Sequence, residues 1–200
     1  MEKKYIENQH HFCQSNSLFF DKEIESKIKK VKAYFNDISF EMFVYNSTDF
    51  VSNSIRDYGS WESYSMNKVI NCLKYYSKKK KLSKKEITIL DIGSNVGWYS
   101  FYLANAGYDI YSFEVSQINT YILKKNFCLN ENIRVTIINK GILDKEEKCL
   151  LHHPSHNIGN GVILCGENSN FVRKDEYLTE EIEFTKLSNY YNFLSKKILL

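Results

Sequence analysis

Two carboxylates stand at the ends of two apolar segments that a glycine-containing turn separates in the sequence. Asp91 lies inside the run ITILDI (Ile87–Ile92), and Glu114 directly follows YDIYSF (Tyr108–Phe113). Because a buried carboxylate is costly unless something binds it, Asp91 is a candidate ligand-binding group. A carboxylate at the tip of the second strand of a βαβ unit is where a ribose diol is held, and Glu114 has that position in the sequence. The two residues therefore predict a ligand that contains a nucleoside.

The five-residue turn GSNVG at positions 93–97 narrows the choice of nucleoside. Its glycines are spaced G-x-x-x-G, whereas a nicotinamide dinucleotide site reads G-x-G-x-x-G. Gly93 lets a ligand approach the backbone, and Ser94 or Asn95 can cap the helix that follows. An acid two residues before Gly93 would repel a pyrophosphate but suits a cation. S-adenosyl-L-methionine carries an ammonium and a sulfonium and no phosphate, so we expect it as the cofactor; an ordinary βαβ turn with chance glycines is the alternative.

Alternating strands and helices must position these residues. Apolar, β-branched runs predict parallel strands that are buried on both faces. The expected elements are the strand Ile87–Ile92, the helix Val96–Ala106, the strand Tyr108–Phe113, the helix Ser116–Phe127 and the strand Arg134–Ile138. This order predicts an α/β fold of the Rossmann-like kind.

Four segments together resemble one known family. They are IRDYGSWE (Ile55–Glu62), LDIGSNVGWYSFYLA (Leu90–Ala104), YSFEVSQIN (Tyr111–Asn119) and KKNFCLNENIRVTIINKGILD (Lys124–Asp144). The sequence resembles the FkbM-type family of class I S-adenosylmethionine-dependent methyltransferases, over roughly residues 43–200. The family usually has proline after the acid of the second strand, and this chain has Val115.

The resemblance implies a Rossmann-like class I methyltransferase fold and methyl transfer to a hydroxyl oxygen of a small molecule or sugar. It does not assign the catalytic base. The implied cofactor-binding residues are Asp91, Gly93, Ser94, Asn95, Gly97, Glu114, Val115, Asn119, Gly141 and Ile142. Tyr58, Trp61 and Glu62 are expected at the mouth of the substrate or cofactor site, an aromatic turn that only packs on the domain being the alternative.

Three parts are expected along the chain: a poorly ordered tail over 1–20, an N-terminal helix, hairpin and helix over 21–85, and the cofactor domain over 86–200. In the second part we expect a helix Lys22–Phe35, a strand Phe40–Tyr45 with a hairpin partner at Thr48–Ile55, and a helix Glu62–Ser77.

Short antiparallel strands are expected in the last part, at Lys148–His152, Gly161–Cys165 and Glu181–Phe184. A short helix at Leu187–Leu194 and the start of a fourth core strand at Lys196–Leu200 would follow. The resemblance implies that most of this core sheet's other half lies beyond the sequence. We therefore expect an incomplete fold, either a fragment of a longer product or a chain that self-associates through an exposed sheet edge.

Composition limits the class of protein. The 200 residues are 43% hydrophobic and 26% charged, as in one globular domain. A net charge of +3 is too small to argue for nucleic acid. No run approaches the ~20 apolar residues that span a bilayer. The five cysteines are scattered without a C-x-x-C motif, which predicts reduced thiols in a cytoplasmic protein.

Several alternatives remain open. The histidines His152, His153 and His156 could include a general base, but they lack the spacing of a zinc site. The lysines 78–81 fit a solvated helix end better than a nucleic-acid patch. The main functional alternative is a non-catalytic cofactor-binding module or an inactive fragment of a methyltransferase. A nicotinamide oxidoreductase is disfavoured by the glycine spacing and by Asp91.

Overall fold

A computed structural model describes residues 9–14, 22–46, 49–130, 132–154, 157, 159–166, 177–194 and 198–199. Residues 9–14, inside the stretch expected to be a poorly ordered tail, are helical. In the described residues, no helix is both long and apolar enough to cross a membrane.

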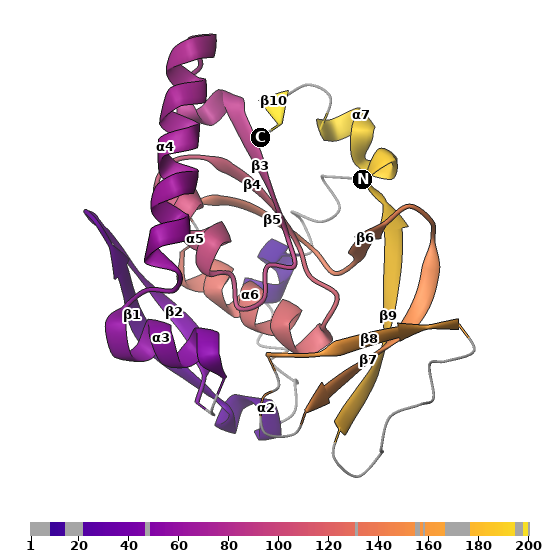
Figure 1. The fold of residues 1–200 in the computed structure, drawn as a ribbon. Helices are drawn as coiled ribbons and strands as arrows, with labels where there is room; N and C mark the ends of the chain where they lie inside the picture. Colours follow the sequence, from indigo (N-terminus) through magenta and orange to yellow (C-terminus); the bar gives the residue numbers. More distant parts are fainter. Residues whose placement is uncertain are drawn as a thin grey trace.

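The predicted βαβαβ unit is present (Figure 1). Its strands are β3 (Ile87–Ile92), β4 (Asp109–Phe113) and β5 (Arg134–Ile138), connected by α5 (Trp98–Asn105) and α6 (Gln117–Leu129). All pairs are parallel, and a two-residue strand β10 (Ile198–Leu199) pairs with the other side of β3, in the order β10-β3-β4-β5. Since β10 reaches only Ile87 and Thr88, the rest of β3 has no partner on that side among the described residues.

Each face of the parallel sheet is covered by a different set of side chains. On one face, the apolar residues of β3, β4 and β5 join a core with α4, α5 and α6, which includes Phe101, Leu123 and Phe127. On the other face, Phe113 contacts Tyr190, whose ring centroid lies 5.1 Å away in an edge-to-face arrangement. The central strand β4 is therefore buried along its whole length, as its apolar sequence predicts, whereas Ile92 at the end of β3 is 52% exposed.

The helix predicted over Lys22–Phe35 is wrong. Only α2 (Lys22–Ser26) is helical, and β1 (Ile28–Phe35) forms an antiparallel hairpin with β2 (Ile38–Tyr45). The hairpin turns at Asn36, whose φ of 49° suits a tight turn between strands. Ala33 of β1 and Met42 of β2 are both fully buried in the main core.

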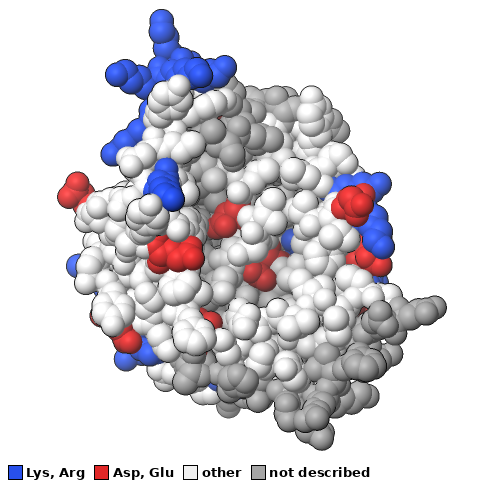
Figure 2. Space-filling view, in the orientation of Figure 1, with Lys and Arg blue, Asp and Glu red and all other residues white. Residues whose placement is uncertain are grey.

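The hairpin partner predicted at Thr48–Ile55 is also wrong, because its residues 50–55 belong to the helix α3 (Phe50–Tyr58), and Thr48 lies outside the described residues. Asp49 starts the helix by accepting a hydrogen bond from the backbone of Ser52 at 2.7 Å. The helix α4 (Ser63–Lys80) follows, close to its predicted range, and a short turn η1 (Lys84–Glu86) leads into β3. Figure 2 shows lysine side chains gathered at the end of α4 that projects from the molecule.

A second, four-stranded sheet lies beside the parallel one (Figure 1). Its order is β6-β9-β7-β8, formed by β6 (Gly141–Leu143), β7 (Glu147–Pro154), β8 (Val162–Cys165) and β9 (Tyr177–Lys186). The three predicted antiparallel strands are confirmed as β7, β8 and β9, except that Gly161 lies outside β8. The turns η3 (Leu187–Tyr190) and α7 (Tyr191–Leu194) confirm the short helix predicted before β10.

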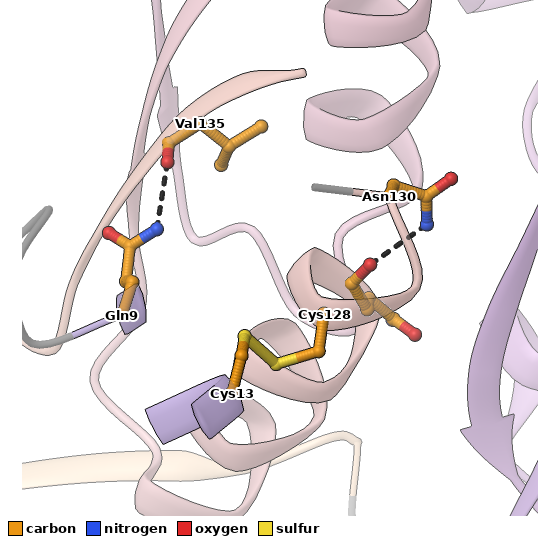
Figure 3. The surroundings of a disulfide bond; sticks show 6 residues. Gln9, Cys13, Cys128, Asn130 and Val135 are labelled. Atoms are coloured by element: carbon orange, nitrogen blue, oxygen red, sulfur yellow. Dashed lines mark hydrogen bonds between the residues drawn. A yellow bond between two sulfur atoms is a disulfide. The ribbon is translucent and has the colours of Figure 1, made fainter. Parts of the chain in front are cut away.

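Two disulfides contradict the expectation of reduced thiols. Cys13 is joined to Cys128 at the end of α6, and Cys149 to Cys165, its partner in the register of β7 and β8. Figure 3 shows the first disulfide beside the bond from Gln9 to Val135. The paired cysteines stand 115 and 16 residues apart in the sequence, so only the folded chain reveals their proximity. A cytoplasmic location, which was inferred from reduced thiols, loses that support.

Candidate functional site

The turn that follows β3 is attached to the end of β4. The backbone N–H groups of Gly93 and Ser94 both donate to the carbonyl of Phe113, at 2.9 and 3.1 Å. Gly93 has a φ of +81°, and a Cβ built there would meet no atom within 4 Å. The predicted strand-to-turn exit at this glycine is thus present, and the space beside it is open to a ligand.

Glu114 is buried at the end of β4, with 5% of its surface exposed. Its Oε2 accepts from the backbone N–H of Asn95 at 2.7 Å, and its Oε1 from that of Ser116 at 2.9 Å. Burial raises the pKa of Glu114 to about 6, although these N–H groups and the Asn119 side chain favour the charged form. The carboxylate therefore links the glycine turn to the first residues of α6.

Asp91 is bound in a similar way to the first turn of α5. Its Oδ2 accepts from the Ser100 hydroxyl at 2.6 Å. Burial raises the pKa of Asp91, and the bonds from Ser100 oppose that rise. A cavity of about 310 Å³ borders it, lined by Val69, Cys72, Leu73, Ile89, Leu90, Asp91, Tyr99 and Leu103. Figure 2 shows acidic side chains in and around a hollow near the middle of this face of the molecule.

Ser94 and Asn95 do not cap α5, contrary to expectation. Gly97 occupies the cap position and makes no side-chain capping bond. The buried Ser94 hydroxyl donates instead to the Asp91 carbonyl at 3.0 Å, and Asn95 adopts a φ of 52° and accepts from its neighbour Val96. These two residues therefore hold the turn in shape.

Gly97 has a packing role. Its φ is +92°, and a Cβ there would lie 2.6 Å from side-chain atoms of both Phe101 and Leu123. No other residue type fits this crossing of α5 and α6 without displacement of the core.

Val115 and Gly141 lie side by side where the two sheets meet. A Cβ at Gly141 would overlap Val115 and Phe184, so the glycine allows this close contact. Ile142 is half-buried beside Tyr190 in the cluster on the other face of the parallel sheet. A polar hollow of about 350 Å³ adjoins Val115, lined by Val115, Gln117, Asn139, Glu181, Ile182 and Glu183.

Asn119 faces the hairpin. It is buried in the first turn of α6, and its Oδ1 accepts from the Tyr45 hydroxyl at 2.6 Å. The Asn119 side chain also donates to Glu114, so two hydrogen bonds connect Tyr45, at the end of β2, to that carboxylate.

The three residues expected at the site mouth differ in their contacts and exposure. Glu62 accepts a hydrogen bond from Tyr99, whose hydroxyl lies 3.0 Å away and which lines the cavity beside Asp91. Burial and the nearby Glu62 raise the pKa of Tyr99 to about 12. Trp61 is half-buried at the margin of the main core, and Tyr58 is 73% exposed. Only Glu62 of the three is thus linked to a residue of the Asp91 cavity by a described contact.

Sequence reasoning missed two residues that bind at the helix starts: Ser100, which donates to Asp91, and Glu180, which binds the start of α6. Ser100 follows Asp91 by nine residues, and its first-turn position in α5 is a signal that could have revealed it. Glu180 could not have been found in this way: its Oε2 accepts from the backbone of Gln117 at 2.9 Å, across 63 residues of sequence.

The histidines have structural partners. His153 Nε2 lies 2.7 Å from Oε1 of Glu180, and His152 Nδ1 lies 2.8 Å from the Thr179 hydroxyl. His156 lies outside the described residues. The pair of His153 and Glu180 therefore connects β7 and β9 to the start of α6.

A methyltransferase is among the solved structures that are similar to part of this chain. No protein-family model matches the chain, and no curated protein matches it, so membership of the FkbM-type family stays a prediction. The chain is similar to the tRNA (uracil-54, C5)-methyltransferase of Pyrococcus abyssi, solved in complex with S-adenosyl-L-homocysteine. The match has 18% identity and a TM-score of 0.33, covers 55% of this chain and spans only 23% of that one.

Proposed function

We propose that this chain binds S-adenosyl-L-methionine as a class I methyltransferase domain of the FkbM type, with methyl transfer to a hydroxyl of a small molecule or glycan. One observation carries the proposal: each strand-terminal acid binds the start of the helix that follows it. Asp91 binds Ser100 of α5, and Glu114 binds Ser116 at the start of α6.

This arrangement disfavours phosphate-bearing cofactors. In dinucleotide-binding folds, the N-terminus of the helix after the glycine turn receives the pyrophosphate. Here carboxylates already occupy both helix starts, and a phosphate would meet negative charge at either one. A cofactor with a sulfonium, an ammonium and no phosphate avoids this repulsion. Glu114, at the end of the second strand, is the acid suited to the ribose hydroxyls.

The polar hollow next to Glu114 suits the adenine. The lining is almost entirely polar, since Ile182 is 2% exposed. Glu181 and Glu183, which pair with Lys148 and Lys140, would offer acceptors to an exocyclic amine. At about 350 Å³, the hollow is large enough for a nucleobase. At the opposite end, Asp91 and the Glu62–Tyr99 pair supply negative charge for the ammonium.

The fit requires one local change. Glu114 is bound by donors from Asn95, Ser116, Val115 and Asn119, which fill the about four acceptor positions of a carboxylate. A ribose hydroxyl must therefore replace one of them. Asn95 is the candidate, because it lies in the turn beside the open space at Gly93 and has a positive φ.

Bound S-adenosyl-L-methionine would supply an electrophilic methyl group. The chain's own contribution would be alignment of the acceptor oxygen with that methyl, which is the larger part of such catalysis. A base must also accept the hydroxyl proton. No residue is assigned to that role, since His153 is 3% exposed and paired with Glu180.

Calorimetric titration with S-adenosyl-L-homocysteine tests the proposal. We expect binding by the wild type and at least about tenfold weaker binding by Glu114→Gln and Asp91→Asn, since each loses charge-assisted hydrogen bonds. Glu86→Gln, which removes an exposed acid, is the matched control. A folded wild type that gives no heat with this ligand, or that binds NADH more tightly, would refute the proposal.

A second candidate function is a non-catalytic module in which both acids serve only to hold the fold. The full set of donors around Glu114 favours it. In that case Glu114→Gln and Asp91→Asn would lower the free energy of unfolding, and no nucleoside would bind the wild type.

A further inference from the structure

The projecting end of α4 is strongly basic. Seven lysines and no acid occur between residues 74 and 85, and all seven are exposed: Lys74, Lys78, Lys79, Lys80, Lys81, Lys84 and Lys85. Figure 2 shows the largest group of basic side chains on this face of the molecule at the projecting end of α4. Five lysines elsewhere in the described chain have acidic partners, such as Lys140 with Glu183 at 2.8 Å, whereas Lys78–Lys81 form no ion pair with a described residue.

Exposed tyrosines share a side of the same helix. Tyr64 and Tyr75 are 74% and 65% exposed, unusually high for aromatic residues. Lys68 Nζ lies 4.4 Å from the centre of the Tyr64 ring, and Lys79 Nζ lies 5.6 Å from that of Tyr75. Positions 64, 68, 75 and 79 follow the helical repeat, so they form one stripe on the side opposite the buried residues of α4.

We propose that this Lys–Tyr face, formed by the stripe and the seven lysines, docks on the surface of an anionic lipid bilayer. Lysines near such a surface are attracted by its negative potential, and tyrosine is enriched at the boundary between headgroups and acyl chains. The interaction of the last lysines with the helix dipole explains Lys78–Lys80. It does not explain two exposed tyrosines along the stripe.

The shape of the face favours a bilayer over a nucleic acid. In Figure 1 the end of α4 extends past the parallel sheet, a convex feature that a flat surface can meet. Single-stranded nucleic acids are bound in positively charged grooves, with frequent arginine stacking. The Lys–Tyr face has no arginine.

Vesicle flotation of the full chain tests this proposal. We expect binding to vesicles of phosphatidylcholine with about one third phosphatidylserine, none to phosphatidylcholine alone, and loss of binding at high salt. Lys79→Gln/Lys80→Gln should weaken binding about tenfold or more. The control Lys29→Gln/Lys32→Gln removes two exposed lysines of β1 and should change binding less than about twofold.

A second pair of variants tests the contribution of tyrosine to vesicle binding. Tyr75→Ser should weaken vesicle binding, whereas Tyr191→Ser, at a tyrosine 68% exposed in α7, should not. Equal losses from both lysine pairs would mean that only net charge matters, and would overturn the proposal. So would binding to neutral vesicles, no vesicle binding at all, or tighter binding of a single-stranded oligonucleotide than of vesicles at the same salt.

Discussion

The carboxylate of Glu114 accepts a hydrogen bond from the backbone N–H of Asn95 at 2.7 Å, so the acid at the end of one strand holds the turn that follows its neighbour. A single buried side chain thus couples β4, the glycine turn and the start of α6. Any ligand that binds Glu114 must act on all three, and the ionisation of Glu114 must affect the stability of the fold.

The pH dependence of stability should reveal this residue. Burial raises the pKa of Glu114 from 4.5 to about 6, so the native state binds more protons than the unfolded state between these values. The free energy of unfolding should therefore fall as the pH rises through this window, by about 2 kcal/mol. Urea denaturation at several pH values should show this fall in the wild type and not in Glu114→Gln. A Glu114→Gln variant with the same slope as the wild type would contradict the assignment.

Ser100→Ala should destabilise the fold through Asp91. The substitution removes a 2.6 Å bond to a half-buried carboxylate and leaves it short of donors. We expect a loss of about 1–3 kcal/mol at neutral pH, and a smaller loss in acid, where Asp91 is protonated. Chemical denaturation measures both values. The exposed Ser39→Ala is the control, and an effect of Ser100→Ala no larger than that of the control would be evidence against a supporting role.

The two glycines of the turn should respond differently to alanine. At Gly97, a Cβ meets Phe101 and Leu123 at 2.6 Å, so Gly97→Ala should cost about 2 kcal/mol or more of stability. At Gly93 only the positive φ is unfavourable, and the cost should be about 1 kcal/mol.

Ligand binding should report on the space beside Gly93. The added methyl of Gly93→Ala would enter the open space beside the turn, so this variant should fold and yet bind S-adenosyl-L-homocysteine more weakly. Melting temperatures and calorimetry on the same samples give both readouts. If Gly93→Ala bound the ligand like the wild type, the ligand would not approach the turn at that residue.

The sequence predicts the central sheet well because parallel strands buried on both faces are continuous apolar runs. β3 was predicted with the same bounds, Ile87–Ile92, and β5 with Arg134–Ile138. The segment Ile28–Phe35 was misread because its apolar residues fit a helical repeat, and only its pairing with β2 decides in favour of a strand.

The candidate site was predictable only in part. The acids and glycines are visible because they interrupt apolar runs. The long-range hydrogen bonds around them cannot be read from the sequence, since Tyr45 bonds Asn119 across 74 residues and Glu180 bonds Gln117 across 63. Asn126 shows the same limit: the resemblance singled out its motif, but its bonds to the backbone of Phe43 and Val96, which join the hairpin to α5 and α6, depend on the folded chain.

The disulfide between Cys13 and Cys128 should protect the outer edge of the parallel sheet. Residues 9–14 lie against β5, where Gln9 donates to the Val135 carbonyl at 2.8 Å and accepts from the Ile137 N–H at 2.7 Å. This side chain therefore satisfies backbone groups that an edge strand would otherwise leave unpaired. Without the disulfide, the short helical segment should detach more often.

Hydrogen exchange can detect that detachment at a single amide. In Cys13→Ser/Cys128→Ser, the Ile137 N–H should exchange faster than in the wild type, whereas Cys149→Ser/Cys165→Ser should leave its rate unchanged. The first pair closes the longer loop, so its loss should also lower stability more, by about 4–5 kcal/mol against about 3 kcal/mol on loop-closure entropy. Equal exchange at Ile137 in both variants would show that Gln9 stays bound without the covalent link.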